Sequence, residues 1–218
     1  IAFGLVLGFG PALYQFERNI IENLITDKNE ELGRALEQIK ELAIRDELTG
    51  VFNRRHMLEV LDHEKALADR KNYDFSVCYV DLDYFKKVND KFGHATGDSV
   101  LKNFSRVAEQ VTREVDCVAR IGGEEFILVL SGTNETDAVT VARRLAEGLR
   151  DMHVSRIEPR YRISASIGIA EYRSSESIQQ LLDRADRAMY DSKRNGRNRI
   201  VVAGESGAEP GFVNNGAV

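Results

Sequence analysis

The stretch that decides the fold reads DCVARIGGEEFILVL and covers residues 116–130. Two mostly apolar runs, Asp116 to Ala119 and Glu125 to Leu130, flank the pair Gly122-Gly123, and this pattern predicts a hairpin of two strands. Residues without a Cβ let a phosphate or a sugar approach the backbone closely. Because Glu124 and Glu125 follow the glycines, the turn is a candidate site for a metal and a nucleotide, although Gly-Gly is also an ordinary hairpin connection.

A second acidic stretch ends another predicted strand. Residues 75–82 are mostly apolar and lead into Asp81-Leu82-Asp83. Side chains alternate along a strand, so Asp81 and Asp83 point to the same side where the strand ends. Two carboxylates in this position suit Mg²⁺, a hard cation that shares its oxygen ligands with substrate phosphates. For either acid, the alternative is that it caps the following turn.

Helices and strands alternate through the rest of the chain. We expect helices at residues 53–69, 98–111, 136–152 and 177–195, and strands at residues 161–172 and 199–202. Residues 204–218 are rich in glycine and lack apolar periodicity, which predicts a disordered tail.

Length and charge narrow the class of protein. A chain of 218 residues with 43% hydrophobic residues suits one globular domain with appendages. A formal net charge of -5 argues against a nucleic-acid partner, which needs a broad basic surface. Cys78 and Cys117 lie in strand-like runs without the neighbours of a zinc site, so we expect both to be reduced and buried.

The N-terminal residues suggest two appendages. Residues 1–14 are almost entirely apolar or glycine, yet fall short of the roughly 20 residues that span a bilayer. They fit the end of a transmembrane helix, and also a soluble apolar helix end or the remnant of a signal peptide.

Residues 15–47 carry a heptad pattern that predicts a coiled-coil signalling helix, with Lys28 interrupting its core position. The seam comprises Ile21, Ile25, Leu32, Ala35, Ile39 and Leu42. The alternative is one amphipathic helix packed on its own domain.

Several motifs in order resemble one family, the GGDEF domain of diguanylate cyclases, over about residues 46–202. The glycine-acid motif is present as Arg120-Ile121-Gly122-Gly123-Glu124-Glu125-Phe126, with glutamate at the usual aspartate position. The other matches are Asp46 to Arg55, Asp81 to Asp90, Phe92-Gly93-His94 with Gly97-Asp98, Ser166-Ile167-Gly168, and Ala188-Met189-Tyr190 through Lys193, Gly196, Arg197 and Asn198.

The resemblance implies an α+β fold over residues 48–203, with a central, mostly antiparallel five-stranded sheet flanked by helices, as in nucleotidyl cyclases and polymerase palms. It also implies a GTP site with Mg²⁺ or Mn²⁺. Asp81, Glu124 and the Leu82 carbonyl would hold the metal, with Glu125 as a further catalytic acid. The implied GTP-binding residues are Asn89 and Asp98 for guanine, and Lys86, Lys193, Arg197, Gly122, Gly123 and the backbone of Tyr84 and Phe85 for the phosphates.

The implied activity joins two GTP molecules into cyclic di-GMP between two facing domains of a homodimer. Arg113 and Asp116 match the family's RxxD product-inhibition motif, and Arg144 aligns with its additional arginine. We also expect a cytoplasmic catalytic domain under an upstream sensor, and residues 1–14 predict that the full-length protein is anchored in the inner membrane. Two alternatives remain: a silent receptor domain for cyclic di-GMP or GTP, and a structural dimerisation module.

Overall fold

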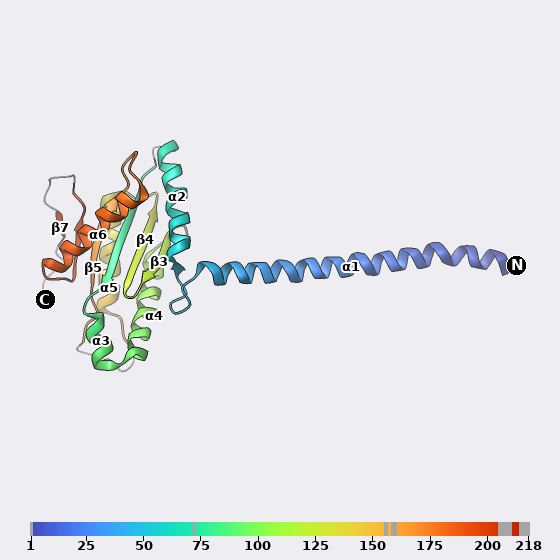
Figure 1. Ribbon diagram of the computed structural model, residues 1–218, viewed down its shortest axis with the longest axis horizontal. Helices are drawn as coiled ribbons and strands as arrows, with labels where there is room; N and C mark the ends of the chain where they lie inside the picture. The colour runs from blue at the N-terminus through green and yellow to red at the C-terminus, as the bar shows by residue number, and fades with distance from the viewer. Residues whose placement is uncertain (1, 72, 155–156, 158–160, 205–210, 214–218) are drawn as a thin grey trace. The chain divides into compact units, whose positions relative to one another are not determined.

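A computed structural model describes residues 2–71, 73–154, 157, 161–204 and 211–213 (Figure 1). The chain divides into two units, residues 1–43 and residues 44–218. The first unit consists almost entirely of α1 (Ala2–Ile44).

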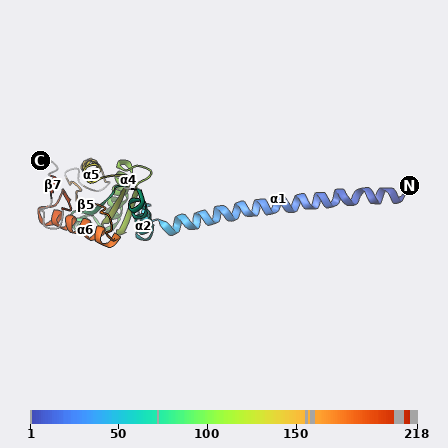
Figure 2. The same cartoon turned by 90° about the horizontal axis from the view of Figure 1, so that it is seen from above.

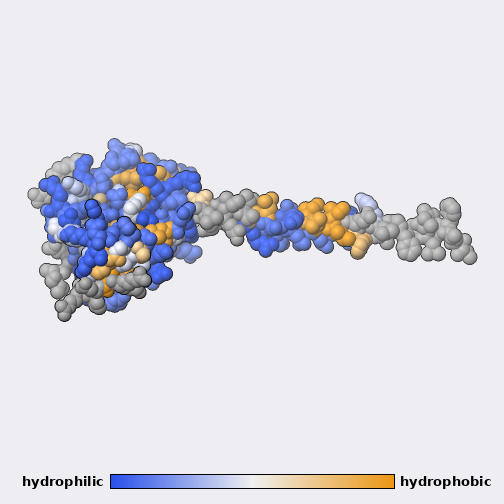
Figure 3. Space-filling view, turned by 60° about the horizontal axis from the view of Figure 1, so that its bottom comes forward, coloured by the Kyte–Doolittle hydropathy of each residue, from blue (hydrophilic) through white to orange (hydrophobic). Residues whose placement is uncertain are grey.

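The outer surface of α1 carries exposed apolar side chains. Figure 3 shows them as an apolar patch along one side of the helix, opposite a hydrophilic side. The exposed residues include Ile20, Ile21, Leu24, Ile25 and Leu32. In the part of the chain that the structure describes, no helix is both long and apolar enough to cross a membrane.

The second unit is built around one mixed sheet. Its strands are β1 (Phe52–Asn53), β2 (Phe75–Leu82), β3 (Cys117–Gly122), β4 (Glu125–Ser131), β5 (Ala165–Glu171), β6 (Arg199–Val202) and β7 (Gly211–Val213). They lie in the order β1-β3-β4-β2-β5-β6-β7. The pairs β1–β3 and β5–β6 are parallel and the others antiparallel, which confirms the mostly antiparallel sheet.

The expected strand count was wrong, because the described residues form seven strands and not five. The additional strands β1 and β7 are edge strands of two and three residues, too short for an alternating pattern to show. Strand β7 and Gly204 are the described parts of the predicted tail, whose other residues lie outside the described ranges.

Helices cover both faces of the sheet. They are α2 (Arg54–Lys71), α3 (Phe85–Phe92), α4 (His94–Val111), α5 (Glu135–Arg150) and α6 (Ile178–Arg194). Helices α4 and α5 lie on one face, and α2 and α6 on the other (Figure 2). The alternation along β2 explains both layers, since Cys78 and Val80 join the first core while Phe75 and Val77 join the second.

Helix α6 packs very closely on the sheet, and this contact positions the end of the helix. At Gly168 in β5, a Cβ atom would overlap the backbone of Ala185 and Met189. Ser177 and Gln180 form a capping box that begins the helix. Its last turn, with Lys193, is therefore fixed relative to the neighbouring strand β2.

Candidate active site

The two acidic stretches lie side by side at one end of the sheet. Strand β2 pairs with β4 so that Asp81 lies opposite Glu125, and the Leu82 amide donates a hydrogen bond to the Glu124 carbonyl over 3.3 Å. On its other side, β2 pairs with β5, where Asp81 lies opposite Ser166. The structure thus brings the predicted hairpin acids and the predicted strand-end acids into one place.

Asp81 is one of two buried acids in this cluster, the other being Asp83. The Asp81 side chain forms an ion pair with Lys193, with 2.6 Å between Oδ2 and Nζ. Burial raises the pKa of Asp81, the Lys193 ammonium opposes that rise, and the nearby Asp83 adds to it. A buried carboxylate beside a basic helix end is what a site for a metal and a phosphate requires.

The hairpin acids share this environment. Burial raises the pKa of both Glu124 and Glu125, the Asp81 carboxylate raises it further, and Lys193 opposes both effects. The pKa of the Tyr79 phenol is also raised, first by burial and then by the charge of Glu125. These carboxylates repel one another, so a cation bound among them would relieve the repulsion.

The donor set fits a magnesium ion that keeps some water. Within the described residues, no group of three or more His, Cys, Asp or Glu side chains is gathered for a metal. Mg²⁺ is usually held by one or two carboxylates together with phosphate oxygens and water. Asp81, Glu124 and the Leu82 carbonyl meet that requirement.

Asp83 has a structural role that distinguishes it from Asp81. Its carboxylate accepts hydrogen bonds from the hydroxyls of Ser164 and Ser166, each over 2.7 Å, and from the backbone amide of Asn198 over 2.9 Å. Asp83 thereby ties the end of β2 to β5 and to the loop after α6. That loop carries Arg197, one of the residues predicted to bind phosphate.

Arg197 stacks on an aromatic side chain beside the site. Its guanidinium carbon lies 4.7 Å from the centre of the Tyr84 ring, and Lys87 Nζ lies 4.3 Å from the same centre. The Tyr84 backbone, at φ 56°, precedes α3 in a left-handed conformation. The predicted phosphate-binding residues Tyr84, Lys86 and Arg197 therefore gather at the start of α3.

The predicted guanine-binding residues lie on two helices that meet at Gly93. Asn89 is on α3, and Asp98 is exposed on α4. The Asn89 carboxamide lies against Gly97, where a Cβ atom would overlap its Oδ1. Gly97, the residue before Asp98, thus leaves room for the Asn89 side chain.

Arg120 is a site residue that the sequence analysis missed. Its Nε and Nη2 atoms donate hydrogen bonds to the Gly123 carbonyl over 3.0 and 2.7 Å. Its Nη1 atom donates to Asp46 Oδ1 over 3.1 Å. Arg120 therefore fixes the glycine turn to the segment that follows α1. Its place two residues before Gly122 is the signal that could have identified it.

The RxxD residues form a turn beside a separate hollow. Asp116 accepts hydrogen bonds from the backbone amides of Arg113, over 2.8 Å, and Ser131, over 3.1 Å. The hollow has a volume of about 270 Å³, and Arg113 and Asp116 line it together with Arg45 and Phe52. Arg144 is exposed on α5 and is not among the described residues that line the hollow.

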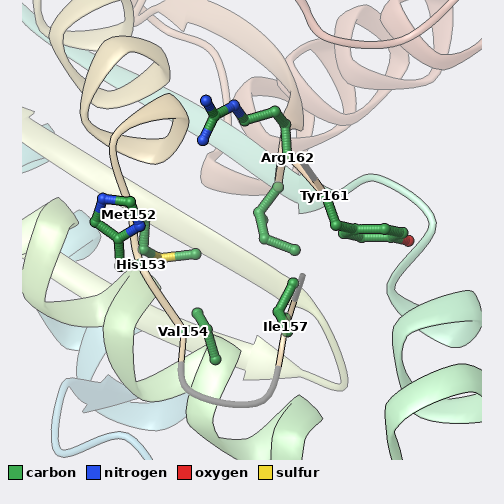
Figure 4. A pocket seen from close by; sticks show the side chains of 7 residues that line it. Met152, His153, Val154, Ile157, Tyr161 and Arg162 are labelled. Carbon is green, nitrogen blue, oxygen red and sulfur yellow. The ribbon is translucent and has the colours of Figure 1, made fainter. Parts of the chain in front are cut away.

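A smaller hollow of about 60 Å³ lies in the connection between α5 and β5 (Figure 4). Met152, Val154 and Ile163 are among the side chains that line it. None of the described lining residues belongs to the acidic cluster or to the RxxD turn. The two cysteines are both free and buried, as predicted.

Comparisons with known proteins identify the family of this chain. A model of the family described as diguanylate cyclase, GGDEF domain, matches residues 43–199. Diguanylate cyclase A of Treponema denticola is 32% identical over 192 residues, which are 86% of this chain and 51% of that protein. The chain thus spans about half the length of that relative.

Two solved structures share the fold. The coiled coil and GGDEF domain of DgcB from Caulobacter crescentus, in complex with c-di-GMP, matches with a TM-score of 0.77 and 32% identity, covering 82% of this chain and 95% of that one. Diguanylate cyclase SiaD from Pseudomonas aeruginosa, in complex with its activator SiaC, matches with a TM-score of 0.73 and 36% identity, covering 93% and 78%. Since the family model matches well over half of its residues, the chain belongs to the diguanylate cyclase GGDEF-domain family.

Proposed function

We propose that the chain is a diguanylate cyclase that condenses two GTP molecules into cyclic di-GMP and releases two pyrophosphates. The observation that carries the proposal is the meeting of Asp81, Glu124 and Lys193 where β2 ends. A receptor domain that had lost catalysis would need the guanine and phosphate contacts but would not need this acidic cluster.

Each residue has a part in this reaction. Asn89 and Asp98 bind the guanine edge, while Lys86, Lys193, Arg197 and the backbone at Tyr84 and Phe85 neutralise and align the phosphates. Asp81, Glu124 and the Leu82 carbonyl would hold Mg²⁺ or Mn²⁺, which when bound supplies a Lewis acid for the α-phosphate and lowers the pKa of the attacking 3′-hydroxyl. Glu125 adds negative charge beside these ligands, and Gly122 and Gly123 leave room for the nucleotide.

The reaction needs two copies, because each GTP must supply a hydroxyl to the other across a two-fold axis. The exposed apolar side of α1 supports a homodimer in which the paired helices raise the effective concentration of the facing domains. An upstream sensor or activator would act by shifting this helix pair. Replacing Ile25 and Leu32 with glutamate should lower activity most at low protein concentration, and equal activity at every concentration would contradict this role.

Product inhibition is the second part of the proposal. Arg113 and Asp116 lie on one preformed turn beside a hollow, and the related DgcB domain was solved with c-di-GMP. We assign cyclic di-GMP to this turn, with Arg144 as an additional contact. Arg113→Ala should abolish inhibition by the product while leaving the acidic cluster untouched.

The decisive experiment incubates the full chain with GTP and Mg²⁺ and detects cyclic di-GMP by chromatography. Bound nucleotide is first removed, and Glu124→Ala serves as the inactive control. Chelation of the metal should stop product formation, and adding Mg²⁺ should restore it. A wild-type chain that binds cyclic di-GMP but forms none would refute the cyclase proposal in favour of a receptor.

A further inference from the structure

The hollow beside the RxxD turn has a second wall that comes from the segment after α1. Arg45 and Phe52 line the hollow together with Thr112, Arg113 and Asp116. Arg45 directly follows α1 in the chain, and it forms an isolated antiparallel bridge with Phe52. A ligand in this hollow would thus lie between the RxxD turn and the start of the catalytic domain.

Arg45 is already held in a fixed orientation. Its Nη1 atom donates a hydrogen bond to the Gly50 carbonyl over 2.9 Å, and its guanidinium carbon lies 4.8 Å from the centre of the Phe52 ring. The Phe52 ring in turn contacts His56, with 4.4 Å between the ring centres. A planar cation that is held in advance loses little side-chain entropy when it binds an anion.

The charges in the hollow select a particular ligand chemistry. Arg45 and Arg113 offer two guanidinium groups, while Glu109 and Glu114 offer carboxylates. A simple anion would satisfy the arginines and be repelled by the glutamates. A guanine nucleotide satisfies both, because its phosphates accept hydrogen bonds from arginine and the guanine edge donates hydrogen bonds to a carboxylate.

We propose that Arg45, supported by Phe52, is a phosphate-binding residue of the cyclic di-GMP site, opposite Arg113. The inference rests on the proposed product-inhibition site and adds a wall to it. In this arrangement Asp116 shapes the turn, because it accepts hydrogen bonds from two backbone amides. Arg45 supplies a second cation within the hollow itself, whereas Arg144 is not among the described residues that line it.

The position of Arg45 gives this ligand a route to the active site. The next residue, Asp46, forms an ion pair with Arg120 over 3.1 Å, and Arg120 holds the Gly123 carbonyl of the glycine turn. A ligand bound by Arg45 would therefore also affect the adjacent Asp46, which holds the catalytic hairpin through Arg120. Binding of cyclic di-GMP would thereby change the turn at Gly123 without any contact between cyclic di-GMP and GTP.

Calorimetric titration of cyclic di-GMP into the nucleotide-free full chain tests the inference. Arg45→Gln is expected to weaken binding by about tenfold or more, since it removes a charged hydrogen-bond donor. Arg45→Lys keeps the charge but loses the planar fork, and a roughly threefold or greater loss is expected. Arg143→Gln removes an exposed arginine from α5 and should bind like the wild type. Arg45→Lys decides the outcome if Arg45→Gln does not fold.

Arg113→Ala is measured in parallel so that two failures can be told apart. If the Arg45 variants bind like the wild type while Arg113→Ala does not, the inference fails and the inhibition site stands. If all three bind like the wild type, both are wrong. Hydrogen exchange gives a second readout: cyclic di-GMP should slow exchange at residues 122–124 in the wild type and not in Arg45→Gln. Unchanged exchange in the wild type would refute the proposed route.

Discussion

The substitution Gly97→Ala should weaken GTP recognition while leaving the fold intact. A Cβ atom at residue 97 would overlap Asn89 Oδ1 and would lie 3.0 Å from Asn89 Cγ and 3.2 Å from Phe85 Cζ. Most of the overlap is with the end of one side chain, so Asn89 can turn away while the backbone stays in place. The residue expected to bind guanine would then point elsewhere.

The expected effects on stability nearly cancel. Gly97 lies in α4 and does not have a positive φ, so alanine would stabilise the helix by about 1 kcal/mol. Turning Asn89 out of its preferred rotamer costs about 0.5–1.5 kcal/mol.

The effect on catalysis does not cancel. The lost hydrogen bond to guanine is worth about 0.5–1.5 kcal/mol, which lowers kcat/KM for GTP by roughly two- to tenfold.

Initial rates of pyrophosphate release over a range of GTP concentrations give kcat/KM, and urea unfolding gives the free energy of unfolding. Gly148→Ala is the matched control, because its Cβ atom would also meet a side-chain end, Val107 Cγ1 at 2.6 Å, in the packing between α4 and α5. It should leave kcat/KM unchanged. Wild-type kinetics in a folded Gly97→Ala variant would refute the assignment of Asn89 to guanine. A loss of stability above about 2 kcal/mol would show that the backbone had moved instead.

Three further predictions concern other parts of the domain. Tyr84→Ala should raise KM for GTP several-fold, because Arg197 loses the ring on which it stacks. Tyr84→Phe keeps the ring and should leave KM unchanged. Equal KM values for Tyr84→Ala and the wild type would count against the stacking role. Burial raises the pKa of Cys78 and Cys117 to about 12, so neither thiol should react with iodoacetamide at pH 8 until the protein unfolds, and prompt labelling of the native chain would contradict this. Burial acts to raise the pKa of Asp46, but its hydrogen bonds outweigh burial and lower the pKa below 3.8. Its stabilising effect is therefore present at neutral pH and lost as the pH falls through the lowered pKa. Asp46→Asn should thus destabilise the chain at pH 7, and by progressively less as the pH falls through the lowered pKa, as urea unfolding over a series of acidic pH values would show.

Local sequence patterns predicted the elements that are long enough to display them. The predicted strands at residues 75–82 and 199–202 have the bounds of β2 and β6, because continuous apolar runs mark buried strands. The short elements β1, α3 and β7 were not predicted, since two to eight residues give little periodicity. Their formation depends on neighbours that the sequence pattern does not identify.

Part of the site could not be predicted from local patterns for the same reason. Asp81 and Asp83 are equivalent in a strand pattern, and their difference comes from partners distant in the chain, Lys193 for one and Ser164 with Asn198 for the other. Arg120 likewise needs Asp46, 74 residues away, before its role can be seen. The resemblance to a family supplied the residues, whereas the contacts between them came from the fold.

The contacts of Asp83 also explain how strained backbone is kept beside the site. Among the described residues other than glycine, four have a positive φ, and Tyr84, Arg197 and Asn198 are three of them. Such conformations cost about 1–3 kcal/mol each and persist when surrounding contacts hold them. Asp83, which directly follows β2, accepts a hydrogen bond from the backbone amide of Asn198. The Tyr84 ring stacks on Arg197, so Tyr84 and the loop after α6 also hold each other. Asp83 therefore acts on the proposed reaction indirectly, by fixing the loop that carries Arg197, one of the residues proposed to bind phosphate.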